Sequence, residues 1–306
     1  VYEQVHRFVP DRDAAFHVLG AKIECALQQA LRKLALLLDR WSLTRGGEGQ
    51  VVNLIGEAGI GKSRITRALF DALSEEDFKI AAFHSSPYHR DTAFWPVTSY
   101  LLSASGIETK DSNKVQRDKI RQLLRDAGIE DEGAEGIIAD LLGIPYPDVD
   151  GKMGMSPSAK RAATFSTLSN YVIALSKQKP LVMLIEDAHW TDPTTLELVN
   201  DIVDRLERER IMLLITSRPE IEIALSNRPY SSSMQLNRLS RRGVEEIVTR
   251  LGGDKLPKET IELIIQRTDG VPLFVEELSK VMIESGNLSV PVSLHDTLMA
   301  RLDQLP

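Results

Sequence analysis

The sequence has 306 residues, of which 42% are hydrophobic and 26% are charged, a composition typical of a globular protein large enough for two domains. The formal net charge of −7 argues against a dedicated nucleic-acid surface, because binding to a phosphate backbone needs a basic face. The single cysteine, Cys25, excludes an intrachain disulfide and a cysteine-based zinc site. This cysteine usage fits a reducing compartment, so we expect a cytoplasmic protein. No apolar run approaches the roughly 18 residues that a membrane helix needs, so we expect no membrane partner.

The first predictable element is a helix within residues 21–42, where leucines and Trp41 recur at helical spacing. The loop Arg45-Gly46-Gly47-Glu48-Gly49 follows it and leads into the first strand. Residues 1–20 show no clear period. We therefore interpret residues 1–45 as a lead-in with one helix and no assigned function.

A phosphate-binding loop is predicted directly after the apolar run Val51–Ile55, which itself predicts a buried strand. The pattern G-x-x-x-x-G-K-[ST] is matched at every fixed position by Gly56-Glu57-Ala58-Gly59-Ile60-Gly61-Lys62-Ser63. Glycines let backbone N–H groups turn toward phosphate oxygens, Lys62 brings a positive charge to the β- and γ-phosphates, and the Ser63 hydroxyl can bind Mg²⁺. The sequence therefore predicts a nucleoside triphosphate site formed by these residues and Arg64, which begins an apolar pattern of helical spacing.

The next part of the chain is expected to be mostly helical. Ile80–Phe83 predicts a short second strand, Ser85–His89 a loop and residues 97–104 a helix. Apolar residues at helical spacing continue over residues 115–178, interrupted by the Pro-, Gly- and Asp-rich stretch Gly143–Met155. That stretch is typical of a long surface loop.

Two continuous apolar runs, Leu181–Ile185 and Ile211–Ile215, predict strands that are buried on both faces, as in a parallel sheet. Between them, Asp192 is a predicted N-cap, and an apolar stripe after it is typical of a crossover helix. Strand, helix and strand around a phosphate loop predict a three-layer α/β sandwich with a mainly parallel sheet. After Leu236 the chain is predicted to be helical to its end, with caps at Ser240 and Ser293.

Candidate catalytic residues follow both apolar runs. The first run ends in Glu186-Asp187, and a hydrolytic site needs acids at the carboxyl end of a strand beside the phosphate loop. One carboxylate would hold Mg²⁺ through water and the other would orient the attacking water. The sequence leaves open which of the two faces the metal, and an acidic pair that only caps the next helix is the alternative. Arg218 follows the second run, where it either senses the γ-phosphate or is an ordinary surface arginine.

These positions define the expected site. The candidate catalytic residues are Lys62, Glu186, Asp187 and Arg218, and the candidate metal ligands are Ser63, Glu186 and Asp187. His189 and Trp190 follow the acidic pair and either position it or pack under a loop. His84 and His89 lack the spacing of metal ligands, so we interpret them as structural side chains.

Several motifs in order resemble the bacterial signal-transduction ATPases of the Orc1-like AAA type, known as STAND ATPases. The motifs are Glu186–Pro193, Thr216–Glu220 and Thr268–Leu278. The segments Ser86–His89 and Pro291–Leu302 extend the resemblance to the ATPase module found beside class III adenylate/guanylate cyclase domains and ahead of tetratricopeptide repeats. The resemblance covers residues 34–306. Residues 1–33 do not resemble the family, and Gln28–Leu31 stand where the family usually has Val-Gly-Arg-Glu.

The resemblance implies an additional-strand P-loop fold with a C-terminal all-α subdomain. It implies that Gly270-Val271-Pro272 packs the helical subdomain against the adenine, and that Arg218 is the phosphate-sensing arginine. Mg²⁺ and ATP are the implied cofactors, and slow hydrolysis of ATP to ADP and phosphate is the implied activity. The expected domains are the lead-in over residues 1–45, an ATPase core over 46–236, a helical lid over 237–288 and the start of a following helical domain over 289–306.

Two functions of different classes are therefore expected. The leading one is an ATP-driven regulatory switch in a longer signalling protein, whose partners are a cyclase domain, helical repeats or other proteins. The alternative is a nucleotide-binding interaction platform with little or no hydrolysis. A DNA-associated loader is suggested only by the Orc1-like core, and the net charge of −7 argues against it, so no nucleic-acid partner is expected.

Overall fold

The computed structural model describes residues 25–146, 156–220, 228–252 and 256–285. The predictions for residues 1–24 and 289–306, and most of the predicted loop Gly143–Met155, lie outside these residues. Within the described chain, residues 34–237 form one compact unit, and residues 25–33 with 238–285 belong to a second. None of the helices in these ranges combines the length and the apolar character that crossing a membrane requires.

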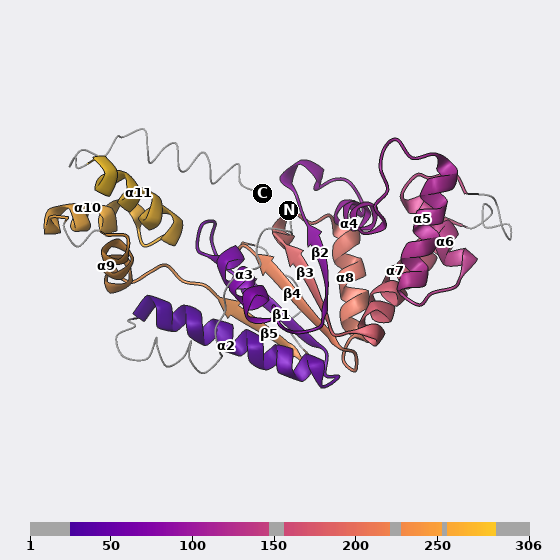
Figure 1. The fold of residues 1–306 in the computed structure, drawn as a ribbon, viewed down its shortest axis with the longest axis horizontal. Helices are drawn as coiled ribbons and strands as arrows, with labels where there is room; N and C mark the ends of the chain where they lie inside the picture. The colour runs from indigo at the N-terminus through magenta and orange to yellow at the C-terminus, as the bar shows by residue number, and fades with distance from the viewer. Residues whose placement is uncertain (1–24, 147–155, 221–227, 253–255, 286–306) are drawn as a thin grey trace. The chain divides into compact units, whose positions relative to one another are not determined.

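A parallel sheet of five strands forms the centre of the described part of the first unit (Figure 1). Its strands are β1 (Gln50–Ile55), β2 (Lys79–His84), β3 (Leu181–Glu186), β4 (Ile211–Ser217) and β5 (Ser231–Gln235). The order across the sheet is β2-β3-β4-β1-β5. β4 pairs with both β1 and β3, so the sheet contains the additional strand that the resemblance implies.

This strand order corrects one expectation about the acidic pair. We expected Glu186 and Asp187 on a strand beside the phosphate loop, but β4 separates β3 from β1. The crossover through α8 (Pro193–Arg205) returns the chain to the position between them. The polar residues at the end of β4 therefore lie between the two halves of the expected site.

Burial explains why four strands were predictable and one was not. The whole of β4 is buried, as are the first five residues of both β1 and β3, which agrees with their continuous apolar runs. β5 was not predicted, because it begins with three serines and buries only Met234. An edge strand needs no apolar run, since it can be held by its ladder to a single neighbour, here β1.

Helices cover both faces of this sheet (Figure 1). On one face, α3 (Lys62–Ala72) and the part of α2 (Cys25–Arg45) from Leu34 onward pack on side chains that include Val52, Leu184 and Met212. On the other face, α4 (Trp95–Ser105), α7 (Pro157–Gln178) and α8 pack on the alternate residues of the same strands. The alternation of the core between two faces confirms the predicted three-layer α/β sandwich.

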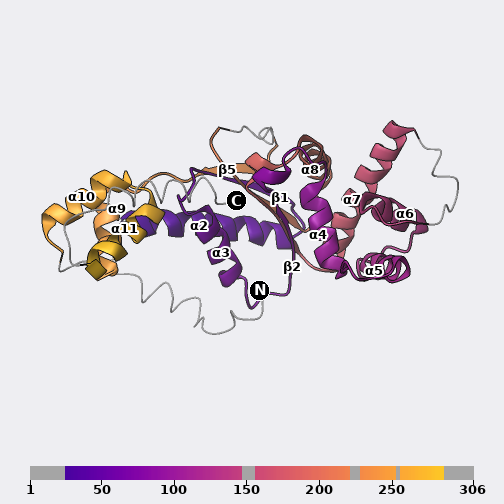
Figure 2. The same ribbon diagram turned by 90° about the horizontal axis from the view of Figure 1, so that it is seen from above.

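The described part of the β2–β3 connection is helical, as predicted for residues 115–178. It holds α4, α5 (Asn113–Asp126), α6 (Glu132–Leu141) and α7, with α5 and α6 beyond α4 in Figure 2. The short turn η2 (Pro87–His89) lies in the predicted loop after β2.

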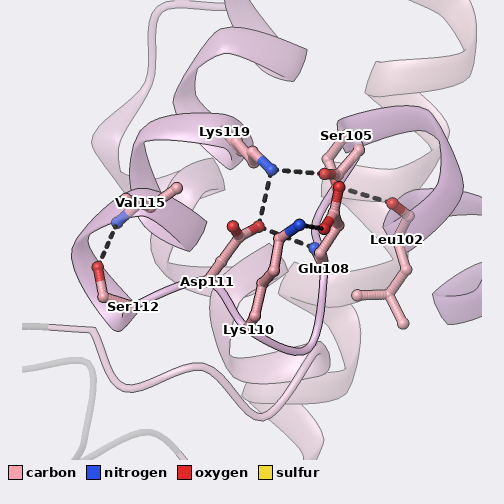
Figure 3. A network of polar contacts seen from close by, with 9 residues as sticks. Leu102, Ser105, Glu108, Lys110, Asp111, Ser112, Val115 and Lys119 are labelled. Atoms are coloured by element: carbon pink, nitrogen blue, oxygen red, sulfur yellow. Dashed lines mark hydrogen bonds and ion pairs between the residues drawn. The ribbon is translucent and has the colours of Figure 1, made fainter.

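Polar contacts fix the turn between α4 and α5 (Figure 3). Lys119 Nζ donates to Asp111 Oδ2 at 2.7 Å and to the carbonyl oxygen of Gly106 at 2.6 Å. Asp111 Oδ2 also accepts from the backbone N–H of Glu108 at 2.8 Å. This backbone hydrogen bond, followed by that from Lys119, lowers the pKa of Asp111. The turn is thereby tied to the second turn of α5.

The second unit contains three helices in its described part, α9 (Arg241–Arg250), α10 (Lys258–Thr268) and α11 (Pro272–Ser285). They enclose a core of their own that includes Val248, Ile264 and Val275. Ser240 caps α9 as predicted, because its hydroxyl accepts from the backbone N–H of Gly243 at 3.2 Å. The predicted cap at Ser293 lies outside the described residues. The described helices agree with an all-α C-terminal subdomain.

Candidate nucleotide-binding site

The phosphate loop joins β1 to α3 at the carboxyl edge of the sheet. The backbone N–H of Gly56 donates to the carbonyl oxygen of Ser217 at 3.0 Å, which ties the start of the loop to β4. A Cβ on Gly56 would lie 2.7 Å from Ile60 Cγ2, so the loop has no room for a larger residue there. Gly61 has a φ of 104°, in the left-handed region that favours glycine, and α3 begins at the next residue. The backbone therefore makes the tight turn that the motif predicts.

Lys62 is the buried cation of this loop, with 8% of its surface exposed. Its Nζ donates to the carbonyl oxygens of Gly56 at 2.7 Å and Glu57 at 3.0 Å. Burial lowers the pKa of Lys62, the charge of Asp187 raises it, and the charge of Arg218 lowers it. Lys62, Asp187 and Arg218 are thus near enough to interact electrostatically. Ser63 and Arg64 are exposed on the first turn of α3.

Asp187 has an unusual backbone conformation directly after β3. Its φ of 52° and ψ of 49° are left-handed, which is uncommon for a residue other than glycine. Its backbone N–H donates to Thr216 Oγ1 at 2.9 Å, so the end of β4 holds this turn. Burial raises the pKa of the Asp187 carboxyl, and the charge of Lys62 opposes the rise. Strained residues of this kind cluster at functional sites.

Glu186 has a partner that the sequence analysis missed. Its Oε2 lies 2.9 Å from Nδ1 of His84, the last residue of β2. The parallel register of β2 and β3 places His84 opposite Glu186. The hydrogen bond that His84 donates to the Glu186 carboxylate raises the pKa of His84 against the effect of burial. His84 therefore contacts a candidate catalytic residue, which our interpretation of it as only structural did not include.

The other histidine interpreted as structural does pack on an aromatic ring. His89 stacks on Trp95 with ring centroids 3.5 Å apart and an interplanar angle of 20°. The stack joins η2 to the first residue of α4.

The end of β4 connects the phosphate loop to the acidic pair. Ser217 Oγ donates to Asn53 Oδ1 at 3.0 Å, a buried bond between β4 and β1. Arg218 follows directly, and its guanidinium carbon lies 5.7 Å from the centre of the Trp190 ring. Trp190, for which the sequence left a positioning or a packing role open, lies against Arg218.

His189 lies in the short turn η4 (Ala188–Trp190) and is 6% exposed. Neither of its ring nitrogens has a hydrogen-bond partner within the described chain, and its Nδ1 is 3.9 Å from Asp187 Oδ1. Burial, followed by the charges of nearby cations, Arg218 first, lowers the pKa of His189 to about 4. The imidazole is therefore neutral near pH 7.

These residues fit a magnesium–nucleotide complex. In such sites Mg²⁺ keeps several waters and takes only one or two protein ligands besides phosphate oxygens. Ser63, Glu186 and Asp187 could supply those ligands. Over the described ranges, no group of three or more His, Cys, Asp or Glu side chains could hold a metal ion. One hydroxyl and two carboxylates form a donor set that suits a metal that binds together with phosphate oxygens.

Pro272 is the one candidate nucleotide contact outside this edge of the sheet. It begins α11 in the second unit, and the carbonyl oxygen of nearby Gly270 accepts from the backbone N–H of Leu239 at 2.8 Å. Its contact with the adenine stays a prediction.

Comparison with known proteins gives a family match and one curated relative. The model of the AAA ATPase domain family matches residues 28–215, so the match begins within residues 1–33, where we expected no likeness. An uncharacterized protein of Rhizobium meliloti (strain 1021) is 25% identical over 319 aligned positions. That alignment spans 98% of this chain and 30% of the relative, so the chain spans less than a third of the relative's length.

Three solved structures are similar at low sequence identity. A STAND protein with a tetratricopeptide repeat sensor from Pyrococcus horikoshii has 16% identity and a TM-score of 0.41, over 88% of this chain and 32% of that chain. Cdc6p from Pyrobaculum aerophilum has 14% identity and a TM-score of 0.45, over 88% of this chain and 65% of that chain. Drosophila ORC bound to DNA has 13% identity and a TM-score of 0.48, over 95% of this chain and 67% of that chain. The family model matches more than half of the chain, including the phosphate loop and the acidic pair, and the chain therefore belongs to the AAA ATPase domain family.

Proposed function

We propose that this chain binds Mg²⁺-ATP, hydrolyses it slowly and serves as a regulatory switch in a longer signalling protein. The observation that carries the proposal is that the phosphate loop and the acidic pair lie at the same edge of the sheet. The charges of Lys62 in the loop and Asp187 in the pair shift each other's pKa. A loop that cradles phosphates beside a carboxylate is what hydrolysis of a triphosphate needs.

Each residue has a role in this proposal. Mg²⁺, when bound, would neutralise charge on the β- and γ-phosphates. Lys62 supplies a second positive charge from within the loop, and Ser63 and one of the two acids face the metal. The other acid orients the attacking water. Arg218 responds to the charge of the γ-phosphate, which is present before hydrolysis and absent after release.

The switch role is supported by the curated relative, which is more than three times as long as the part that this chain matches. A module within a longer protein can pass its nucleotide state to neighbouring domains, and the resemblance to STAND ATPases suggests cyclase domains or helical repeats as those neighbours. The predicted adenine contact of Pro272 belongs to the same proposal.

The nucleotide site is tested by replacing its lysine. We expect Lys62→Ala to weaken Mg²⁺-ATP binding by about tenfold or more, because the loop loses its charge-assisted donor to the phosphates. Isothermal titration measures the affinity. Arg67→Ala is the matched control, since Arg67 is an exposed residue on the same helix. Equal affinities of wild type and Lys62→Ala would mean that the loop does not bind the phosphates.

A nucleotide-binding platform is the second candidate function, and the pairing of Glu186 with His84 favours it. The Glu186 carboxylate is already paired with His84 on the neighbouring strand β2, in place of a metal or an attacking water. Phosphate release is measured for wild type and for a double variant, Glu186→Gln with Asp187→Asn. Equal rates together with a rise in melting temperature on adding ATP would support the platform. A rate at least about tenfold higher in wild type would support hydrolysis by the acidic pair.

A further inference from the structure

Beside the proposed site, His189 is a buried polar side chain that makes no hydrogen bond to any of the residues that the structure describes. Both ring nitrogens are shielded from solvent, and neither finds a partner in the described part of the protein. Burying a polar group without a hydrogen bond costs free energy, because its bonds to water are lost and not replaced. Buried groups of this kind are rare in folded proteins, and each one calls for an explanation, of which a catalytic role is one.

The main chain around His189 is held firmly in place. The N–H of Asp187 donates to Thr216 Oγ1 at 2.9 Å, and the carbonyl oxygen of Asp187 accepts from the N–H of Trp190 at 2.8 Å. The backbone of Asp187 is thus bonded on both sides of its Cα. The direction of its carboxylate, by contrast, is set by side-chain torsions that these two bonds do not restrain.

The imidazole of His189 lies close enough to that carboxylate to be a candidate for restraining it. Its Nδ1 lies 3.9 Å from Asp187 Oδ1, about 1 Å beyond a normal N–H···O bond. A movement of about 1 Å would bring the two atoms within hydrogen-bond distance. A neutral imidazole has one N–H and one bare nitrogen, so it can donate from Nδ1 while staying uncharged.

We propose that His189 is a positioning residue, which donates a hydrogen bond from Nδ1–H to the Asp187 carboxylate when Mg²⁺-nucleotide is bound. The bond fixes the direction in which Asp187 faces the metal or the attacking water. The same turn carries Trp190, whose ring lies 5.7 Å from the guanidinium carbon of Arg218. The turn η4 therefore supports one anionic and one cationic group of the site. This inference rests on the proposed hydrolytic function.

Three substitutions separate positioning from packing. His189→Asn keeps an amide N–H near the position of Nδ1, His189→Gln places one near Nε2, and His189→Leu removes both. We expect His189→Leu to lower kcat about 10- to 100-fold, as loss of a supporting hydrogen bond to a reacting group does, and to change the KM for ATP less than about threefold. His189→Asn should recover most of the rate, and His189→Gln should not.

The thermal stability of the variants provides a second, independent test of the positioning role. Replacing an unpaired buried polar side chain by an apolar one of similar size removes the unsatisfied atoms, so the melting temperature of His189→Leu should equal or exceed that of wild type. In an Asp187→Asn background, His189→Leu should lower kcat by a clearly smaller factor, because the pair is already broken. A kcat of His189→Leu equal to that of wild type, or equal recovery by Asn and Gln, would overturn the proposal.

A spectroscopic readout does not depend on turnover. In protein labelled with ¹⁵N-histidine and saturated with Mg²⁺ and a non-hydrolysable ATP analogue, NMR should show the His189 ring protonated at Nδ1 and bare at Nε2. The Nδ1 proton signal should move in Asp187→Ala. The opposite tautomer, or a signal insensitive to Asp187→Ala, would contradict the pairing. If wild type binds the analogue but does not hydrolyse ATP, the hydrolytic function fails and the NMR result alone decides the His189–Asp187 bond.

Discussion

His84 and Glu186 illustrate, at the scale of single residues, how pH should act on this site. The pair is open to solvent, with 69% of the His84 side chain and 27% of the Glu186 side chain exposed. The hydrogen bond that His84 donates to the Glu186 carboxylate raises the pKa of His84 above its ordinary value of about 6.5. The folded protein therefore holds this proton more tightly than the unfolded chain. The resulting stability is fully present below about pH 6.5 and is lost as the pH rises through the folded pKa.

We therefore expect a pH-dependent effect of His84→Gln. At about pH 6 it should lower the free energy of unfolding by less than about 1 kcal/mol, since the pair is largely exposed, and at about pH 9 the effect should be smaller still. Urea unfolding of wild type and variant at both pH values measures the difference. An effect that grows with pH would show that the charged form of His84 does not stabilise the pair.

The residues of the site divide into those that a motif specifies and those that only the fold brings together. Lys62 and Asp187 could be named as candidates from the sequence, because each stands at a fixed place after a buried strand. The bond of Thr216 to Asp187 and the pair of His84 with Glu186 were not. Both depend on the register of neighbouring strands whose residues are far apart in the sequence. No local spacing reports that register.

At the scale of elements, a buried carboxylate holds α5 and α6 together. Glu135 in α6 is 6% exposed and accepts from Arg121 Nε in α5 at 3.1 Å. Its other oxygen accepts from the hydroxyl of Tyr146 at 2.8 Å. The carboxylate is thus satisfied from two directions, which is the condition for burying a charge at modest cost.

We expect Arg121→Met to lower the free energy of unfolding by about 2 kcal/mol, because it leaves a buried carboxylate without its cation. Tyr146→Phe should cost about 1 kcal/mol, since the bond from Arg121 remains. Urea unfolding measures both. Arg125→Met is the matched control, an exposed arginine on the same helix that should change stability by less than about 0.5 kcal/mol. An Arg121→Met effect no larger than that of Arg125→Met would show that Glu135 does not depend on its partner.

The elements also show which patterns were sufficient for prediction. Apolar runs predicted the four strands from β1 to β4, and helical spacing with caps predicted α8 and α9. The serine-rich β5 escaped because an edge strand is defined by its neighbour and not by its own apolar pattern. The insertion of β4 between β1 and β3 was available only from the resemblance, since strand order is a property of crossovers and not of single strands.

At the scale of the whole molecule, charge bears on the kind of partner. A formal net charge of −7 repels a phosphate backbone, so we expect no measurable binding of duplex DNA. Fluorescence anisotropy with a labelled duplex, at about 50 and 200 mM salt, measures this. An affinity that falls steeply as the salt concentration rises would contradict the expectation and favour a DNA-associated role.

The pairing of β1 has a consequence for the synthesis of the chain. Val51 pairs with Leu213 in β4 and with Ser231 in β5, which are made roughly 160 and 180 residues later. At a synthesis rate of about 5 to 20 residues per second, β4 and β5 emerge roughly 10 to 40 s after the apolar run of β1 that precedes the phosphate loop. Such distant pairing folds slowly and leaves strand edges exposed in the meantime. The segment that defines the nucleotide site is thus synthesised well before the strands that complete its sheet, which makes the nascent chain a natural client for chaperones.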